Sequence, residues 1–110
     1  MPKRMEKIDE LIAQQLGQII SVDIELPIGS LATITKVKTS ADLKQAKIFL
    51  SIWPESKQRE IMSLLINSLP KIQSALNNRL TLRNIPKLRF IIDETGQDVA
   101  KLDQLLKELK

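Results

Sequence analysis

A proline, Pro70, interrupts the helical apolar pattern of residues 61–80, and this break constrains the fold more than any other feature of the chain. Proline lacks a backbone N–H, and its ring clashes with the carbonyl four residues before it. Helical backbone angles are also disfavoured for the residue before a proline, here Leu69. The pattern therefore predicts two helices that meet at residues 68–70, with Ser68 capping the second helix and Pro70 in its first turn.

The start of that second helix is a candidate anion site. Free amides at a helix N-terminus bind phosphate groups, and we expect such amides at Leu69, Lys71 and Ile72. The Lys71 side chain lies beside them, and Arg79 and Arg83 follow further along the chain. A serine before a proline often does no more than start a helix, so the sequence alone leaves both interpretations open.

Positive charge is concentrated in the middle of the chain. Residues 36–89 contain eleven basic and three acidic residues, a net charge of +8, whereas residues 1–35 and 90–110 each contain three basic and five acidic residues, −2 each. Such a distribution favours a polyanionic partner, most often nucleic acid, over an ordinary solvated surface. Besides Ser68, Lys71, Arg79 and Arg83, the residues that we expect to contact phosphates lie on predicted strands: Lys36, Lys38, Lys47, Lys87 and Arg89.

The composition excludes several kinds of chemistry. The chain has no cysteine and no histidine, which removes thiol nucleophiles, disulfides, Cys/His zinc sites and histidine acid–base catalysis. Asp93 and Glu94 are adjacent, as is common at a solvated strand end, whereas two-carboxylate catalysis needs both groups aimed at one bond. We therefore expect no catalytic residue, no metal and no cofactor. The sequence has no signal-peptide or membrane-span pattern, which predicts a cytoplasmic protein.

The apolar periodicity predicts one domain, residues 1–110, of the α+β class. The expected elements are a helix over residues 3–20, strands over 31–39 and from 46 to 53, helices over 55–67 and 70–80, a strand over 87–93 and a last helix from 98. This α-β-β-α-kink-α-β-α order predicts a three-stranded sheet with helices on one face. In the first strand, the odd-numbered residues 31–37 are expected to share a face. Phe49 and Trp53 are candidates for base stacking, although the chain is poor in the aromatics that an RRM needs.

Two parts of the sequence resemble the ribosome-binding factor A family. They are residues 33–37 with 42–51, and residues 80–90 with Asp93; the same plan is followed by Arg4, Ile8, Leu11, Leu102 and Leu105. The resemblance implies a KH-like fold of type II. It also implies a bacterial factor that binds immature small ribosomal subunits and 16S rRNA and assists their maturation, often in cold adaptation. At the family's Ala-x-Gly helix break this chain has Ser68-Leu69-Pro70, so a proline replaces the glycine.

We therefore expect a monomeric, non-enzymatic RNA-binding factor that grips phosphates through many cations and one helix start. Two alternatives remain open on the sequence alone. One is a protein-interaction adaptor that docks a partner through the exposed sheet face or edge, or through the region of Trp53. The other is a small hydrolase that uses Asp93 and Glu94.

Overall fold

The computed structural model describes residues 2–82 and 84–94, except for the side chains of Pro2 and Lys3. Two predictions fall outside the described residues: Arg83 as a phosphate contact, and the last helix from Asp98. In the described part of the chain, no helix is both long enough and apolar enough to cross a membrane.

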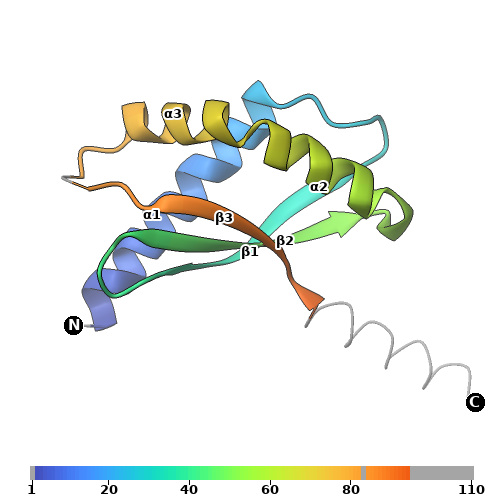
Figure 1. Ribbon diagram of the computed structural model, residues 1–110. Helices are drawn as coiled ribbons and strands as arrows, with labels where there is room; N and C mark the ends of the chain where they lie inside the picture. The colour runs from blue at the N-terminus through green and yellow to red at the C-terminus, as the bar shows by residue number, and fades with distance from the viewer. Residues whose placement is uncertain (1, 83, 95–110) are drawn as a thin grey trace, which may run out of the picture.

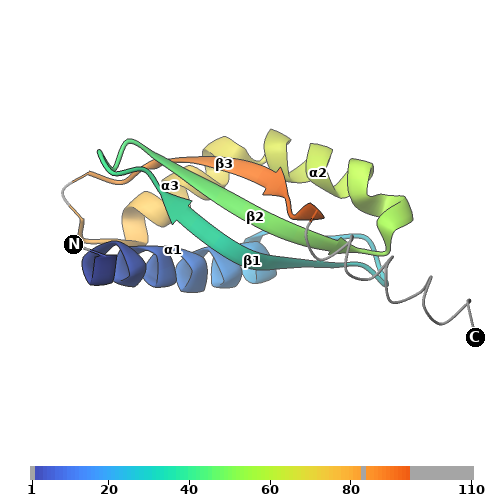
Figure 2. The same ribbon diagram turned by 90° about the horizontal axis from the view of Figure 1, so that it is seen from below.

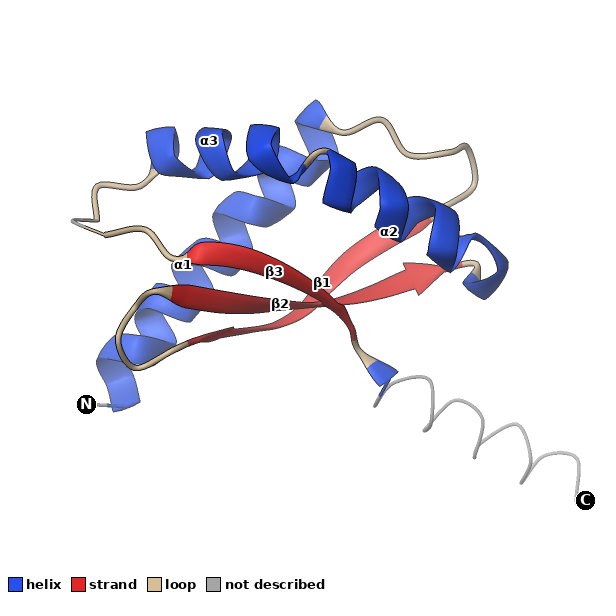
Figure 3. Cartoon of the chain, viewed as in Figure 1, coloured by secondary structure: helices blue, strands red, loops and turns tan. Residues whose placement is uncertain are grey.

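A three-stranded sheet is covered by helices on one face. The elements are α1 (Pro2–Asp23), β1 (Leu31–Thr39), β2 (Gln45–Trp53), a short 3-10 helix (Glu55–Lys57), α2 (Gln58–Asn67), α3 (Leu69–Arg79) and β3 (Lys87–Ile92). β2 is the central strand, antiparallel to β1 and parallel to β3. Figures 1 and 3 show α2 and α3 above the sheet, and Figure 2 looks from below onto its open face. The layers confirm the predicted α+β class.

The hydrophobic core lies between the sheet and the helices. In β2 the predicted alternation is confirmed, because Ala46, Ile48, Leu50 and Ile52 are all buried. Fully buried isoleucine and leucine side chains also come from α1, α2 and α3: Ile12, Leu16, Ile19, Ile61, Leu65, Ile72 and Leu76. Each such side chain contributes roughly 1.5–3 kcal/mol when it leaves water. The core therefore fixes the helices to one face of the sheet and leaves the other face open.

The strand β1 departs from the predicted alternation. Its register with β2 shifts between Ile34 and Lys36, so that Thr35 is the extra residue of a β-bulge. Before the bulge the even-numbered residues pack toward the core, and after it the odd-numbered residues do, with Val37 and Thr39 buried. The single face predicted for the odd-numbered residues 31–37 is therefore wrong. The bulge places the two lysines of β1 on the open face.

The helix break lies where Pro70 predicts it, because α2 and α3 are separate helices with only Ser68 between them (Figure 1). Ser68 has φ −90° and ψ 0°. Its amide donates to the Leu64 carbonyl at 3.0 Å, and its carbonyl accepts from the Ile72 amide at 2.9 Å. Its side chain makes no capping hydrogen bond. The prediction of a side-chain cap at Ser68 is therefore wrong, as is the prediction of a free amide at Ile72.

Candidate nucleic-acid interface

Five basic side chains lie on the open face of the sheet. The pleat that buries Val37, Ile48 and Leu88 turns the alternate residues away from the helices. These exposed residues are Lys36 and Lys38 of β1, Lys47 of β2, and Lys87 and Arg89 of β3. The three strands contain no acidic residue. The open face is therefore a positively charged surface, and we call these five residues the open-face cations.

The strand register brings three of these charges side by side. Lys38 is paired with Lys47 across β1 and β2, and Lys47 with Arg89 across β2 and β3. Neighbouring strands are about 4.8 Å apart, and like charges directly opposite one another destabilise a sheet. This row is therefore unfavourable in the isolated protein, and a bound polyanion relieves the repulsion.

The open-face cations have no partner within the described residues. None of the five forms an ion pair or a side-chain hydrogen bond with another residue of 4–82 or 84–94. The β1–β2 register places Phe49 opposite Lys36, and the β2–β3 register places Gln45 opposite Lys87. The donors of all five side chains are thus available to a ligand.

The other end of the open face is apolar. Leu31 and Trp53 are paired across β1 and β2, with 60% and 67% of their surface exposed. Phe49, nearer the centre of the sheet, is half-buried. The open face therefore combines a basic end near the β1–β2 turn with an apolar end near the start of β1.

Lys71 and Arg79 lie in the helical layer instead. The Lys71 Nζ is 3.5 Å from the backbone oxygen of Asp23, at the end of α1. The Arg79 guanidinium donates to Gln18 Oε1 at 3.1 Å and contacts Gln15 Oε1 at 3.5 Å. Both side chains therefore connect α3 to α1.

The predicted site residues are consequently divided between the two layers of the molecule. Ser68, Lys71 and Arg79 belong to the helices, whereas the five strand residues share the open face. The helix start and the strand cations do not converge on one surface. The phosphate site predicted at the helix break is therefore separate from the surface of the strand cations, and it stays a prediction.

The carboxylate of Asp93 is part of the strand framework. The carboxylate Oδ2 accepts a hydrogen bond from Thr35 Oγ1 at 2.6 Å. The backbone amide of Asp93 donates to the Leu50 carbonyl at 2.8 Å. Glu94 is exposed. These bonds anchor the end of β3 to β2 and to the bulge of β1. Within the described part of the chain, no cluster of three acidic side chains could hold a metal ion.

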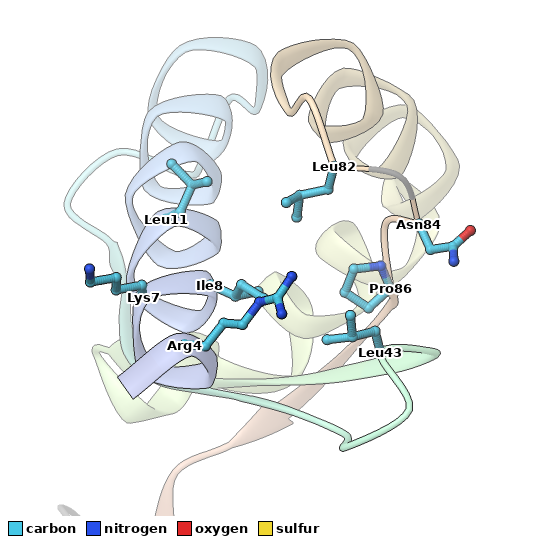
Figure 4. Close-up of a pocket in the computed structure, with 8 residues that line it drawn as sticks. All are labelled: Arg4, Lys7, Ile8, Leu11, Leu43, Leu82, Asn84 and Pro86. Carbon is cyan, nitrogen blue, oxygen red and sulfur yellow. The ribbon is translucent and has the colours of Figure 1, made fainter. Parts of the chain in front are cut away.

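A pocket that sequence reasoning missed opens at the end of the molecule near the N-terminus (Figure 4). Its volume is about 420 Å³, and it lies between α1, the β1–β2 turn and the connection from α3 to β3. Its lining consists of Arg4, Lys7, Ile8, Leu11, Leu43, Leu82, Asn84 and Pro86. All of these residues except Lys7 lie in the parts of the sequence that resemble the family. The resemblance does not indicate a pocket, because three distant segments come together only in the folded chain.

Comparison with known proteins connects this architecture to one family. The model of the family "Ribosome-binding factor A" matches residues 4–106. The ribosome-binding factor A of Akkermansia muciniphila is 31% identical over 109 residues, covering 99% of this chain and 86% of that protein. The Legionella pneumophila protein of that name is 35% identical over 108 residues, covering 97% of this chain and 87% of that protein.

Two structures of Thermus thermophilus ribosome-binding factor A have the same fold. The crystal structure has a TM-score of 0.71 at 18% identity and covers 80% of this chain and 94% of its own. A homology model fitted into the cryo-EM map of a 30S complex of that protein has a TM-score of 0.63 at 22% identity, covering 78% and 91%. These likenesses confirm the expected KH-like fold.

Proposed function

Since this chain belongs to the ribosome-binding factor A family, we propose that it binds immature small ribosomal subunits through the phosphates of 16S rRNA and assists their maturation. One observation carries this proposal: five cations without partners among the described residues share the open face of a sheet whose strands contain no acid. The Thermus thermophilus protein fitted into a map of a 30S complex supports the choice of the small subunit.

The mechanism that we propose uses binding energy and no covalent step. Lysine and arginine side chains neutralise phosphates and release their counterions, which gives affinity without base-by-base recognition. A protein that binds one RNA conformation better than another shifts the population toward it. We propose that such a shift assists rRNA processing, including in cold adaptation. The proposal places the protein in the cytoplasm as a monomer.

Two double variants with the same change of charge test where the RNA binds. Lys47→Ala with Arg89→Ala removes two open-face cations, whereas Lys71→Ala with Arg79→Ala removes two cations of the helical layer. Because a hydrogen bond to a charged group contributes about 1.5–3 kcal/mol, we expect the first pair to weaken binding to purified small subunits at least tenfold. The second pair should bind nearly as the unmodified protein does. Equal losses in both pairs, or a larger loss in the second, would contradict the proposed surface.

The apolar end of the open face favours a second candidate function. Leu31 and Trp53 are exposed side by side, and large exposed apolar residues that adjoin one another mark protein-interaction sites. A protein-interaction adaptor would dock its partner there. RNase treatment of a pull-down distinguishes the two functions, because an adaptor keeps its partner after the RNA is destroyed, whereas an RNA-bound factor loses it.

A further inference from the structure

The pocket at the N-terminal end combines apolar walls with a cationic mouth. Figure 4 shows Arg4 reaching from α1 across the opening toward the side of the pocket formed by Leu43 and Pro86. Lys7 and Asn84 point outward on opposite sides of the mouth. The volume of about 420 Å³ lies within the range of small-molecule sites. The pocket therefore offers an apolar interior to an apolar group and positive charge to whatever is attached to that group.

The polar groups of this pocket have no partners among the described residues. Neither Arg4, Lys7 nor Asn84 makes a side-chain hydrogen bond or an ion pair with another residue of the described ranges. The lining includes no carboxylate. A ligand that carries negative charge beside an apolar group matches this lining, whereas a ligand without an apolar group leaves the walls unused.

One wall is held in an unfavourable backbone conformation. Leu43, in the β1–β2 turn, has φ 61°, which is disfavoured for a residue with a bulky side chain. The turn is closed by hydrogen bonds from the Leu43 amide to the Ser40 carbonyl at 2.9 Å and from the Ser40 hydroxyl to Asp42 at 2.6 Å. Such outliers are common at ligand-binding sites. Here the unusual conformation places an apolar side chain, half-buried, in the wall of the pocket.

The pocket is continuous with the open-face cations. A neighbouring depression of about 480 Å³ shares Leu43 and Asn84 with it and extends to Lys87 of the open face. Lys44 also lines this depression, together with the single acid Asp42. The row of Lys38, Lys47 and Arg89 crosses the three strands close to the β1–β2 turn, and Lys87 lies between its β3 end and the depression. A nucleic-acid backbone bound to this row can therefore continue past Lys87 to the mouth of the pocket.

We propose that the pocket binds one unstacked nucleobase of the RNA that lies along the open face, an inference that rests on the proposed function. The walls formed by Ile8, Leu11, Leu43, Leu82 and Pro86 contact the faces of the base. The Arg4 guanidinium covers it, since arginine planes stack on splayed-out bases in RNA complexes. Lys7, at the outer rim, meets a flanking phosphate. The domain thus requires an unpaired nucleotide at a fixed distance from its phosphate contacts.

Two RNA duplexes of the same sequence, one with a single-nucleotide bulge and one without, test the proposal with the full chain. The two RNAs differ by one phosphate, so the open-face contacts bind both almost equally. We expect the bulged RNA to bind about tenfold more tightly, in keeping with the gain measured for one stacked base. Equal binding of the two RNAs would overturn the pocket and leave the proposed function intact. Failure of both RNAs to bind would overturn the proposed function and the pocket with it.

The variant Leu43→Asn identifies the pocket as the source of the preference. Asparagine tolerates a positive φ, so the turn is expected to fold while the apolar wall is lost. This variant should bind both RNAs with the affinity that the unmodified protein has for the duplex without a bulge. The control Ile28→Asn makes the same kind of change at a loop residue that is 98% exposed, and it should keep the preference. An equal loss of affinity for both RNAs in Leu43→Asn would contradict a base in the pocket.

A crosslink distinguishes RNA from protein as the occupant. Replacement of Asn84, at the rim, by photo-reactive benzoylphenylalanine places the probe beside the pocket mouth. Irradiation of the complex with purified small subunits should join the chain to rRNA. A crosslink to a ribosomal protein would assign the pocket to a protein side chain and overturn the proposal.

Discussion

A single carboxylate links the first helix to the end of the first strand. Asp9 Oδ1 accepts hydrogen bonds from the Thr39 amide at 3.0 Å and from the Thr39 hydroxyl at 2.5 Å. Thr39 is buried, so both donors lose their partner in Asp9→Ala. We expect that variant to lower the free energy of unfolding by about 1.5–3 kcal/mol, measured by urea denaturation. The exposed neighbour Glu10 provides the control, since Glu10→Ala should stay within about 0.5 kcal/mol. Equal effects of the two would refute the link.

The β1–β2 turn depends on a second carboxylate. Hydrogen bonds from the Ser40 hydroxyl and from the Lys44 amide hold the pKa of Asp42 below its ordinary value. A lowered pKa in the folded state means that the stabilisation is complete above the carboxyl's unfolded pKa, about 3.9, and is lost as the pH falls through the folded value. We expect Asp42→Asn to be less stable than the unmodified protein at pH 7, with the gap closing as the pH falls below about 4. A gap that is the same in acid and at neutral pH would show that the charge has no part in the turn.

Predictions from single residues are correct in this chain where the backbone angles are those that the residue favours. Pro70 ends one helix and starts another, as the chemistry of proline requires. The capping role of Ser68 fails because an N-cap residue typically has extended backbone angles, whereas Ser68 has φ −90° and ψ 0°. The bond between Asp9 and Thr39 joins residues 30 positions apart, and nothing in either neighbourhood indicates it.

At the scale of elements, one glutamine fastens α3 to β3. Gln73 Oε1 accepts from the Leu88 amide at 3.0 Å, and its Nε2 donates to the Pro86 carbonyl at 3.1 Å. We expect Gln73→Ala to cost about 1–3 kcal/mol of stability, because these backbone groups lose their partner, and to speed hydrogen exchange at the Leu88 amide. Gln14→Ala, at an exposed position of α1, should change neither quantity. Unchanged exchange at Leu88 in Gln73→Ala would show that the clamp is not needed.

Elements with a regular apolar period are predictable from this sequence, and irregular ones are not. Along β2, side chains that face the core alternate regularly with side chains that face away from it, so its buried face follows from periodicity alone. In β1 the bulge adds one residue, which moves the lysines to the opposite face from Ala32 and Ile34. The sequence shows the bulge only as an imperfect alternation. The first helix also continues to Asp23, beyond the predicted end at Ile20, because no proline or turn residue stops it there.

At the scale of the whole molecule, the charge map indicates a polyanion but not the surface that binds it. The sequence places eleven basic residues in positions 36–89, yet the fold sends Lys71 and Arg79 toward α1 and the strand cations to the open face. The pocket at the N-terminal end unites segments from the first helix, the β1–β2 turn and the connection from α3 to β3. Tertiary contacts decide both arrangements, and local sequence patterns do not contain them.

The salt dependence of binding to small subunits tests the central claim most directly, namely that the open-face cations bind RNA phosphates. Each neutralised phosphate contributes about −0.7 to −0.9 to the slope of log affinity against log salt. Five contacts therefore predict a slope of roughly −3.5 to −4.5. Affinity that does not change between low and high salt would contradict the claim, because cations that bind phosphates release counterions from the RNA.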